Sequence, residues 1–341
     1  MKASQERRSP SYRVVALGGG TGLSAVLRGL KLHVAERGKQ HAKQPISDLT
    51  AVVTVTDDGG SSGRLRREYR VLPPGDIRNC MVALSRDEAL LGDLFQYRFP
   101  SGRGLAGHTF GNLFLTALTN VTGDFPGAVQ VSAEVLAIRG RIYPSTAQNV
   151  TLEAELEDGK IVAGETKISR SRKRIARVRL VPRRVRPLPE VLAALREADL
   201  ILVGPGSLYT SILPNLLVEE VAEVIAHSRA TRVYIANLMT QPGETQNYSV
   251  ADHVRAIYAH TGRSLFDCVV INRAPIEARL LRRYAAQGAE PVDASFAELD
   301  AMRLRYVTGE IVQQEKAIRH DQWRLTRLLL REFMNRGARA G

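Results

Sequence analysis

The chain has 341 residues, of which 44% are apolar, and a formal net charge of +13 at neutral pH. This length and apolar fraction support one large α/β domain or two smaller ones, and they exclude an intrinsically disordered chain. No stretch of about 18 uncharged apolar residues occurs, and residues 1–12 contain no apolar signal core. We therefore expect a cytoplasmic protein without a membrane span. Neither cysteine, Cys80 or Cys268, has a partner at metal-ligand or redox spacing.

The excess positive charge lies partly between residues 167 and 186 and partly in a helix-like run near the C-terminus. Basic surfaces bind polyanions, so nucleic acid has to be considered as a partner. No helix-turn-helix, zinc-finger or RNP-type pattern accompanies these charges. We therefore expect no nucleic-acid partner, and the sequence assigns no function to the basic run.

An apolar run over residues 13–17 enters the loop Gly18-Gly19-Gly20-Thr21-Gly22, and apolar residues then recur at helical spacing up to Leu30. The pattern predicts a strand, a glycine loop and a helix. Such a turn brings backbone N–H groups at a helix N-terminus close to a phosphate. The candidate ligand-binding residues in this loop are Gly19, Gly20, Thr21 and Gly22.

The same loop lacks the lysine and hydroxyl pair of a P-loop NTPase. Its spacing, Gly20-x-Gly22-x-x-Ala25, does satisfy the dinucleotide fingerprint. A nicotinamide-dependent oxidoreductase therefore stays as a remote alternative, with Asp57 or Asp58 as the ribose partner.

Asp57 and Asp58 follow the next apolar segment, residues 49–55, and lead into a loop of glycines and hydroxyls. The segment is rich in β-branched residues and fits a buried strand of a parallel sheet. In open α/β sheets, ligands bind beyond the carboxyl ends of such strands. The two carboxylates are therefore candidates for catalysis or for contact with a ligand or metal, although either could instead cap a turn.

Two later segments place polar residues at predicted helix starts. Residues 73–79 form the entry to a helix predicted over 77–84, with Asp76 as a candidate N-cap. Arg78 and Asn79 lie at the start of this helix, where anions bind. Residues 107–112 precede a helix over 113–118 and contain His108 and Asn112. His108 faces the same cleft or is a structural histidine.

Residues 129–181 show alternating patterns typical of strands. Segments 150–156 and 160–168 flank Glu157-Asp158-Gly159, which is a strong hairpin signal. We expect a β-rich insertion over about 129–185 within a single α/β domain over 13–330. Residues 1–12 are predicted to be disordered, and residues 331–341 are predicted to form a flexible tail.

The α/β pattern resumes with a helix over 189–198 and a strand over 200–203. This strand runs into a second loop of glycines and hydroxyls, which contributes the candidates Gly204, Gly206 and Ser207. Two such loops at strand ends suggest one cleft that holds phosphates.

The strand predicted over 232–236 ends in a polar segment with Asn237 and Thr240 as candidates, and the strand over 268–271 ends in Asn272. Each confident strand of the α/β part thus delivers polar residues to one edge. The predicted fold class is α/β: Rossmann-like, with a mostly parallel sheet, helices on both faces and a β-rich insertion.

Six segments together carry a resemblance to a known family. In chain order they read GGGTGLSAVLRGLK, TVTDDGGSSGRLR, PPGDIRNC, GHTFGN, GPGSLYTSILPNLL and NLMTQPGET. Over residues 13 to about 320 the chain resembles the YvcK-type gluconeogenesis factor family, within the CofD-like group of 2-phospho-L-lactate transferases. The resemblance implies a cytoplasmic bacterial protein that binds a UDP-sugar such as UDP-N-acetylglucosamine. It also implies a need for the protein in cell shape and wall synthesis on gluconeogenic carbon, with protein partners in cell-wall control, and it leaves a homodimer open.

The resemblance also implies roles for residues. The loops at 19–22 and 204–207 would hold the diphosphate, and Asp57 resembles the metal or acceptor-side acid of the transferases, for which Mg²⁺ is the candidate cofactor. Tyr284 and Arg319 resemble positions that bind the nucleotide sugar, although Gln287 stands where an acidic residue is more usual. The remaining residues expected to line the cleft are Asp58, Asp76, Arg78 and Asn112. The insertion after Leu32 and the basic run fall outside the family pattern.

Three functions remain open. The first is a regulatory protein that binds a nucleotide sugar without turning it over. The second is a transferase that moves a phospho-lactate-like group onto a deazaflavin, with Mg²⁺ held by Asp57 or Asp58. The third is the oxidoreductase. The first leads, because the run from Asp57 to Ser62 resembles the regulatory branch and no convincing oxidoreductase residues accompany the glycine loop.

Overall fold

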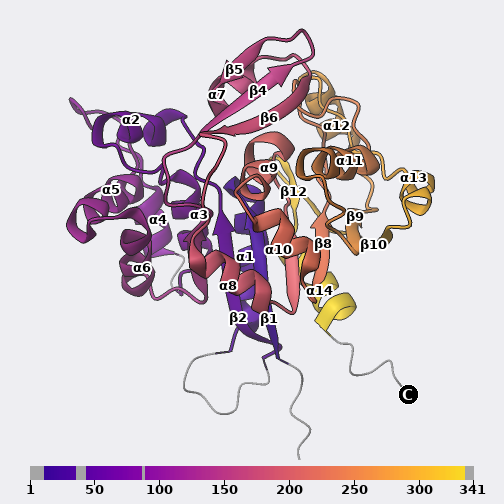
Figure 1. Ribbon diagram of the computed structural model, residues 1–341, viewed down its shortest axis with the longest axis horizontal. Helices are drawn as coiled ribbons and strands as arrows, with labels where there is room; N and C mark the ends of the chain where they lie inside the picture. The colour runs from indigo at the N-terminus through magenta and orange to yellow at the C-terminus, as the bar shows by residue number, and fades with distance from the viewer. Residues whose placement is uncertain (1–10, 36–43, 87–88, 335–341) are drawn as a thin grey trace, which may run out of the picture.

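The computed structural model describes residues 11–35, 44–86 and 89–334 (Figure 1). Seven strands form one sheet, and every neighbouring pair is parallel. The strands are β1 (Tyr12–Gly18), β2 (Ile46–Val53), β3 (Arg141–Pro144), β7 (Leu200–Val203), β8 (Thr231–Ile235), β9 (Cys268–Asn272) and β10 (Arg305–Gly309). The sheet is therefore parallel throughout, which confirms the predicted Rossmann-like α/β class.

The strand order is β10-β9-β8-β7-β1-β2-β3. The chain moves outward from β1 to β3 and then in the opposite direction from β7 to β10. The direction of winding thus reverses between β1 and β7. In open α/β sheets, the crevice for ligands lies at such a switch point, beyond the carboxyl ends of the two strands.

Helices cover both faces of this sheet (Figure 1). On one face, α1 (Gly20–Leu30) packs against α3 (Gly75–Leu84) and α14 (Gln322–Leu329). On the other face lie α8 (Pro189–Glu197), α10 (Val221–His227) and α11 (Val250–Thr261). Because both faces are covered, a strand such as β7 is buried along its whole length, which explains its continuous apolar sequence.

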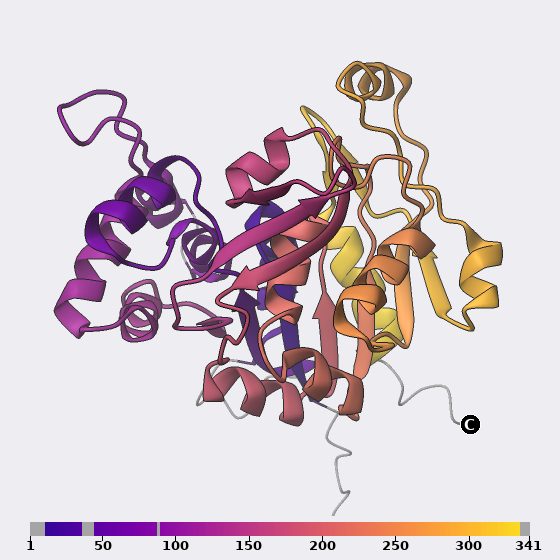
Figure 2. The ribbon, with the colours of Figure 1, turned by 45° about the horizontal axis from the view of Figure 1, so that its top comes forward.

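Most of the remaining helices lie to the two sides of the sheet. Figure 2 shows the group from α2 to α6 on one side and the C-terminal elements on the other. These helices are α2 (Gly60–Tyr69), α4 (Leu90–Gln96), α5 (Phe110–Thr122), α6 (Phe125–Val135), α9 (Leu213–Leu216), α12 (Ala278–Ala285) and α13 (Phe296–Ala301), with short turns η1 (Lys31–His33), η2 (Leu208–Ile212) and η3 (Leu330–Met334).

The β-rich insertion is a three-stranded antiparallel sheet, with β4 (Thr151–Leu156) between β5 (Ile161–Ala163) and β6 (Ile175–Val181). The predicted hairpin across residues 157–159 is confirmed. Two local predictions in this region are wrong. Part of the strand predicted over 160–168 is helix α7 (Glu165–Arg170), and residues 129–135 belong to α6.

The error at α6 has a clear cause. Val129, Val131 and Val135 are spaced like residues of a strand. The start of the segment decides otherwise, because the Asp124 carboxylate accepts a hydrogen bond from the Gly127 N–H at 2.6 Å and a proline occupies the first turn.

The predicted ends of several elements also shift. Asp76 is not an N-cap, since α3 begins at Gly75 after Pro74, and Asp76 lies inside the first turn. Tyr12, predicted to be disordered, begins β1, and residues 331–334, predicted to be part of a flexible tail, form η3 with Phe333 and Met334 buried. The predictions for residues 1–10 and 335–341 lie outside the described residues. In the part of the chain that the structure describes, no helix has the length and apolar character needed to cross a membrane.

Candidate functional site

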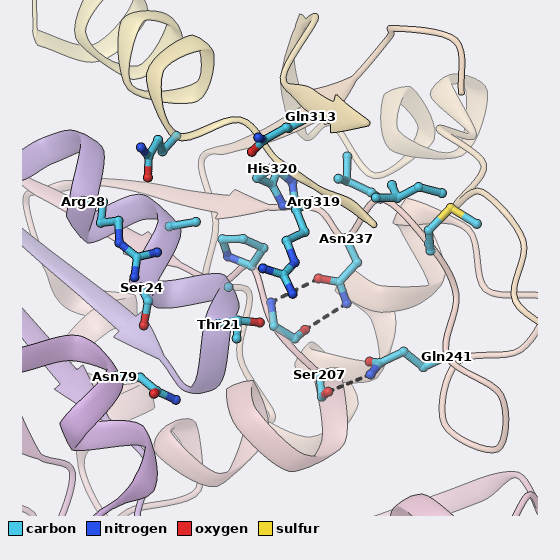
Figure 3. A pocket seen from close by; sticks show the side chains of 18 of the residues that line it. Thr21, Ser24, Arg28, Asn79, Ser207, Asn237, Gln241, Gln313, Arg319 and His320 are labelled. Carbon is cyan, nitrogen blue, oxygen red and sulfur yellow. Dashed lines mark hydrogen bonds between the residues drawn. The ribbon is translucent and has the colours of Figure 1, made fainter. Parts of the chain in front are cut away.

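A cavity of about 430 Å³ lies at the carboxyl ends of β1 and β7, where the strand order reverses (Figure 3). It is bounded by the start of α1, by the loops after β7 and β8, and by a hairpin of β11 (Val312–Gln314) and β12 (Ile318–His320). The predicted site residues that line it are Thr21, Gly22, Asn79, Gly206, Ser207, Asn237, Tyr284 and Arg319. The structure therefore brings eight candidates from six separate segments into one cavity.

The two glycine loops touch each other through their backbones. A Cβ added to Gly22 would lie 2.2 Å from the carbonyl oxygen of Pro205, which no real structure tolerates. Gly20 has a φ of +60°, a conformation that glycine adopts at low cost. These glycines are thus required to seat the start of α1 against the loop after β7.

The first turn of α1 has unsatisfied backbone donors. Gly19 is its N-cap and provides no side-chain hydrogen bond, and no acidic residue lies in the first turn. The Gly20 N–H donates to the Asp76 carboxylate. The remaining N–H groups and the positive end of the helix dipole can interact with an anion. A phosphate-binding role for this loop stays a prediction.

The loop after β7 is held in place by side chains from the loop after β8. Asn237 accepts a hydrogen bond from the Gly206 N–H at 3.1 Å and donates one to the Gly206 carbonyl oxygen at 2.8 Å. Gln241, which the sequence analysis missed, donates to the Ser207 hydroxyl at 2.8 Å. Figure 3 shows both contacts at the floor of the cavity. Asn237 therefore positions the loop, and the Ser207 hydroxyl keeps its proton to donate to a ligand.

The hairpin β11–β12 was not predicted from the sequence, because its strands are only three residues long. Its inner side packs on a small apolar cluster that includes Leu238 and Leu280. The Tyr284 hydroxyl accepts a hydrogen bond from the Ile318 N–H at 3.2 Å, so Tyr284 supports the hairpin as well as lining the cavity. Figure 3 shows the Arg319 side chain extending from this hairpin toward Thr21.

His320, next to Arg319, is buried, and burial lowers the pKa of its imidazole to about 4. It is therefore neutral at physiological pH. Its Nε2 lies 3.2 Å from the Ala236 carbonyl oxygen, which can only accept, so Nε2 carries the proton. The Nδ1 atom is left as a hydrogen-bond acceptor.

The cavity is positively charged. Among the described residues that line it, none is Asp or Glu, whereas Arg28 and Arg319 supply guanidinium groups. The other polar groups are uncharged, and those that the sequence analysis missed are Ser24, Gln96, Gln241, Gln313 and Gln322. Such a lining suits a ligand with both phosphate groups and hydroxyl or amide groups.

The predicted carboxylates lie beside this cavity and do not line it. Asp76 sits behind the first glycine loop, where a Cβ added to Gly19 would lie 2.6 Å from its Oδ2 atom. Burial, together with the nearby Asp57 carboxylate, raises the pKa of Asp76 to about 6. Asp76 thus contacts the first glycine loop and does not line the cavity.

The two adjacent aspartates have different surroundings. Asp58 Oδ1 accepts hydrogen bonds from the Thr166 N–H at 2.9 Å and from the Thr166 hydroxyl at 2.7 Å, so it joins the loop after β2 to the start of α7. Among the described residues, Asp57 Oδ1 accepts a hydrogen bond from the local Gly59 N–H alone, at 2.8 Å. Asp58 is therefore a structural contact to the insertion, and Asp57 has the freer carboxylate.

Two further carboxylates, which the sequence analysis missed, complete this region. Burial, followed by repulsion from Asp57 and Asp76, raises the pKa of Glu165 to about 9. Burial raises the pKa of Glu244 to about 7, and its Oε1 accepts a hydrogen bond from Ser169 at 3.2 Å. We refer to Asp57, Asp58, Asp76, Glu165 and Glu244 as the acidic cluster. Only a fold can reveal it, because its members come from four distant segments.

The remaining candidates form a network that joins α2, α3 and α5. Arg78 donates to Thr109 Oγ1 at 2.6 Å and to Asn112 Oδ1 at 3.1 Å, and Asn112 donates to Ser61 Oγ at 3.1 Å. His108 is buried, and its Nδ1 lies 2.9 Å from the same Ser61 hydroxyl. Burial lowers the pKa of His108. These three candidates therefore brace the helices beside the acidic cluster and do not line the cavity.

Two predicted residues have backbone roles. Thr240 is buried, and its hydroxyl accepts a hydrogen bond from the Glu290 N–H at 2.9 Å. Gly204 turns the chain after β7 with a φ of +81°. Neither lines the cavity.

A metal site was considered at Asp57. Among the described residues, no group of three or more His, Cys, Asp or Glu side chains is arranged to hold a metal ion. The protein side chains alone therefore do not fit a Mg²⁺ site, and a role for Mg²⁺ stays a prediction.

Comparison with known proteins gives a consistent result. The family model of 2-phospho-L-lactate transferase CofD matches residues 14–312. The chain is 49% identical over 319 residues to the gluconeogenesis factor of Bacillus subtilis, covering 93% of this chain and 97% of that protein. It is 51% identical over 309 residues to the gluconeogenesis factor of Listeria monocytogenes, covering 91% and 90%. A crystal structure of a UPF0052 family member from Bacillus halodurans superposes with a TM-score of 0.88 at 44% identity, covering 94% of this chain and 99% of that one.

Proposed function

The chain belongs to the gluconeogenesis factors of the CofD family, and on this premise we propose that the cavity between its two glycine loops binds a nucleotide sugar such as UDP-N-acetylglucosamine. The observation that carries the proposal is the charge of the cavity. Two arginines and the free end of α1 face it, and no described carboxylate lines it. A diphosphate is the group that such a lining stabilises best.

The position of the cavity also supports this ligand. Its floor lies at the switch point between β1 and β7, where α/β sheets bind nucleotides. The diphosphate would lie on the cavity side of the contact between the two glycine loops, beside Gly22 and Gly206 and within reach of Arg319. The neutral amides around the cavity, including Asn79 and Gln313, suit the base and the sugar hydroxyls.

We propose a regulatory role without turnover. None of the carboxylates of the acidic cluster lines the cavity, so they are poorly placed to act as a general base on a bound sugar. His320, the one histidine among the described residues that line the cavity, donates its Nε2 proton to a backbone carbonyl. By the resemblance of the motifs, the bound protein would act in the cytoplasm on partners in wall synthesis and cell shape during gluconeogenic growth.

Calorimetry with UDP-N-acetylglucosamine, GDP and NAD tests the proposal. We expect the UDP-sugar to bind and Arg319→Ala to weaken it by about 1 to 3 kcal/mol, the range for a hydrogen bond to a charged group. Arg319→Lys should recover only part of the lost binding free energy, because lysine lacks the planar guanidinium fork. Arg324→Ala is the matched control, since Arg324 is an exposed arginine paired with Asp321 outside the cavity. Equal binding by parent and Arg319→Ala would place the sugar elsewhere.

The transferase remains a second candidate, because the matching family model is that of a 2-phospho-L-lactate transferase and because the acidic cluster lies next to the cavity. In that case, Asp57 would hold Mg²⁺ together with ligand phosphates and water. Incubation with a nucleotide-linked phospho-lactate donor, a deazaflavin and Mg²⁺ tests it. Steady product formation that Asp57→Asn abolishes would replace the regulatory proposal.

A further inference from the structure

A second cavity, of about 320 Å³, lies on the β-rich insertion and shares no lining residue with the first. It follows β6 from Arg177 to Leu180 and is closed by Arg183 and by Leu217, which comes directly after α9. Three of its lining residues are arginines, and one, Glu155, is acidic. The basic run that the sequence analysis left without a function thus forms the wall of a defined cavity.

The arginines of this cavity differ in their partners. Arg179 is held by Glu153 at 2.9 Å. Arg177 and Arg183 make no ion pair or side-chain hydrogen bond within the described ranges, and both are exposed. Glu155 lies opposite Arg177 in the register of β4 and β6 but not within ion-pair distance. The cavity therefore carries net positive charge that the protein does not compensate.

The backbone of β6 adds a donor. β6 is an edge strand of the three-stranded sheet, with β4 on one side only. The Val178 N–H points away from β4, because it donates to His260 Nε2 at 3.1 Å. Backbone groups alternate along a strand, so the Leu180 N–H points the same way, and it has no hydrogen-bond partner among the described residues.

From this geometry we infer that the cavity along β6 is a second, separate binding site for the phosphate group of a small phosphorylated molecule. A phosphate has enough acceptor oxygens for two guanidinium forks and one backbone N–H, whereas a carboxylate has only two oxygens. The side chain of Leu217 provides an apolar wall for the organic part of the molecule. The inference does not depend on what binds at the switch point.

The position of the bound anion is tested first, by soaking crystals with tungstate as a heavy phosphate analogue. We expect an anomalous peak between Arg177, Arg183 and the Leu180 N–H. Absence of the peak, while tungstate appears at the switch-point cavity of the same crystal, would overturn the inference.

Affinity is tested by calorimetry with pyrophosphate on protein that carries Arg319→Ala, which weakens the first cavity. Adding Arg177→Gln and Arg183→Gln together should weaken the remaining binding about tenfold or more. Arg184→Gln is the matched control, because this exposed arginine belongs to the same run but does not line the cavity. All substituted residues are exposed, so an unchanged melting temperature is expected.

Three results would contradict the inference. An equal loss in Arg184→Gln would mean that only general charge attracts the anion. Binding of citrate as tight as that of pyrophosphate would remove the preference for phosphate. No binding of pyrophosphate at this site would leave the arginines with the role of keeping the β6 edge from pairing with another chain.

Discussion

The two sides of the first glycine loop carry opposite charge. On one side, the cavity at β1 and β7 is lined by arginines and neutral amides. On the other side, the acidic cluster gathers five carboxylates, three of which have a raised pKa. The N-terminus of α1 contacts both, since Gly20 donates a backbone hydrogen bond to Asp76 and Gly22 lines the cavity.

This contrast shows how one helix N-terminus serves two purposes. Its dipole and N–H groups favour negative charge nearby. The protein supplies part of this charge through Asp76, and a ligand in the cavity would supply the rest. Carboxylates in the cavity itself would repel a diphosphate. Because the carboxylates of the acidic cluster do not line the cavity, they do not place negative charge directly against the diphosphate.

The positively charged cavity depends on the contact between the two glycine loops. Gly22→Ala should break this contact. The new Cβ would lie 2.2 Å from the Pro205 carbonyl oxygen, so the loops must separate. We expect the affinity for UDP-N-acetylglucosamine, measured by calorimetry, to fall about 100-fold, since the donors of α1 no longer face the diphosphate.

Gly206→Ala is the matched control for Gly22→Ala. It lies in the facing loop, and its added Cβ would meet Ser211 at 3.4 Å and the Gly19 carbonyl oxygen at 3.7 Å, which are ordinary contacts. A similar loss in both variants, or full affinity in a folded Gly22→Ala protein, would show that the loop contact does not build the site.

The two adjacent aspartates of the acidic cluster are expected to affect stability differently, and substituting each one separately tests this. Asp58→Ala removes the acceptor of both Thr166 donors, and we expect it to lower the free energy of unfolding by about 2 kcal/mol. Asp58→Asn should restore part of this, since Asn keeps the Oδ1 acceptor. Asp57→Asn should leave the stability of the free protein equal or higher, because it relieves repulsion with Asp76 and Glu165.

Thermal unfolding with and without ligand and Mg²⁺ measures these effects. Asp57→Asn should reduce the ligand- or Mg²⁺-dependent rise in melting temperature, whereas Asp58→Asn should not. A loss of stability in Asp57→Asn with an intact ligand effect would make Asp57 a second structural contact and remove the proposed cation role.

The sequence predicted the cavity side better than the acidic side. The glycine loops and strand ends are continuous segments, and the parallel-sheet rule places them at one edge. Arg28 and Ser24 were missed although they lie within the predicted α1, because helical spacing alone does not say which polar face meets a ligand. The hairpin β11–β12 is too short to give a periodic signal.

The acidic cluster could not be predicted, because Glu165 and Glu244 reach it only through the packing of the insertion on the main sheet. Asp58 illustrates the same limit. Its pairing with Thr166 spans 108 residues of sequence, and neither residue carries a motif that points to the other. The sequence analysis therefore gave Asp57 and Asp58 the same interpretation, and only the fold shows that their surroundings differ.

The smallest effect that we expect concerns Glu165, and it tests whether the acidic cluster holds protons at neutral pH. Burial and the neighbouring carboxylates raise its pKa in the folded chain from 4.5 to about 9. A carboxyl whose folded-state pKa is raised stabilises the fold fully below its unfolded pKa and loses this contribution as pH rises through the folded value. The parent should therefore lose stability between pH 4.5 and about pH 9.

Glu165→Gln removes this titration, because the amide resembles the protonated carboxyl and never ionises. Water still reaches part of the side chain. We therefore expect the free energy of unfolding of the variant to exceed that of the parent by only about 1 kcal/mol at about pH 8, and by almost nothing at about pH 5. Thermal unfolding of parent and variant at both pH values measures the difference, which corresponds to roughly 2 °C in melting temperature at the higher pH. Glu157→Gln is the control, since this exposed carboxylate of the insertion only forms a surface pair with Arg174. If the gain of Glu165→Gln is the same at both pH values, Glu165 is ionised throughout, and the charge contrast across the glycine loop is larger than the raised pKa implies.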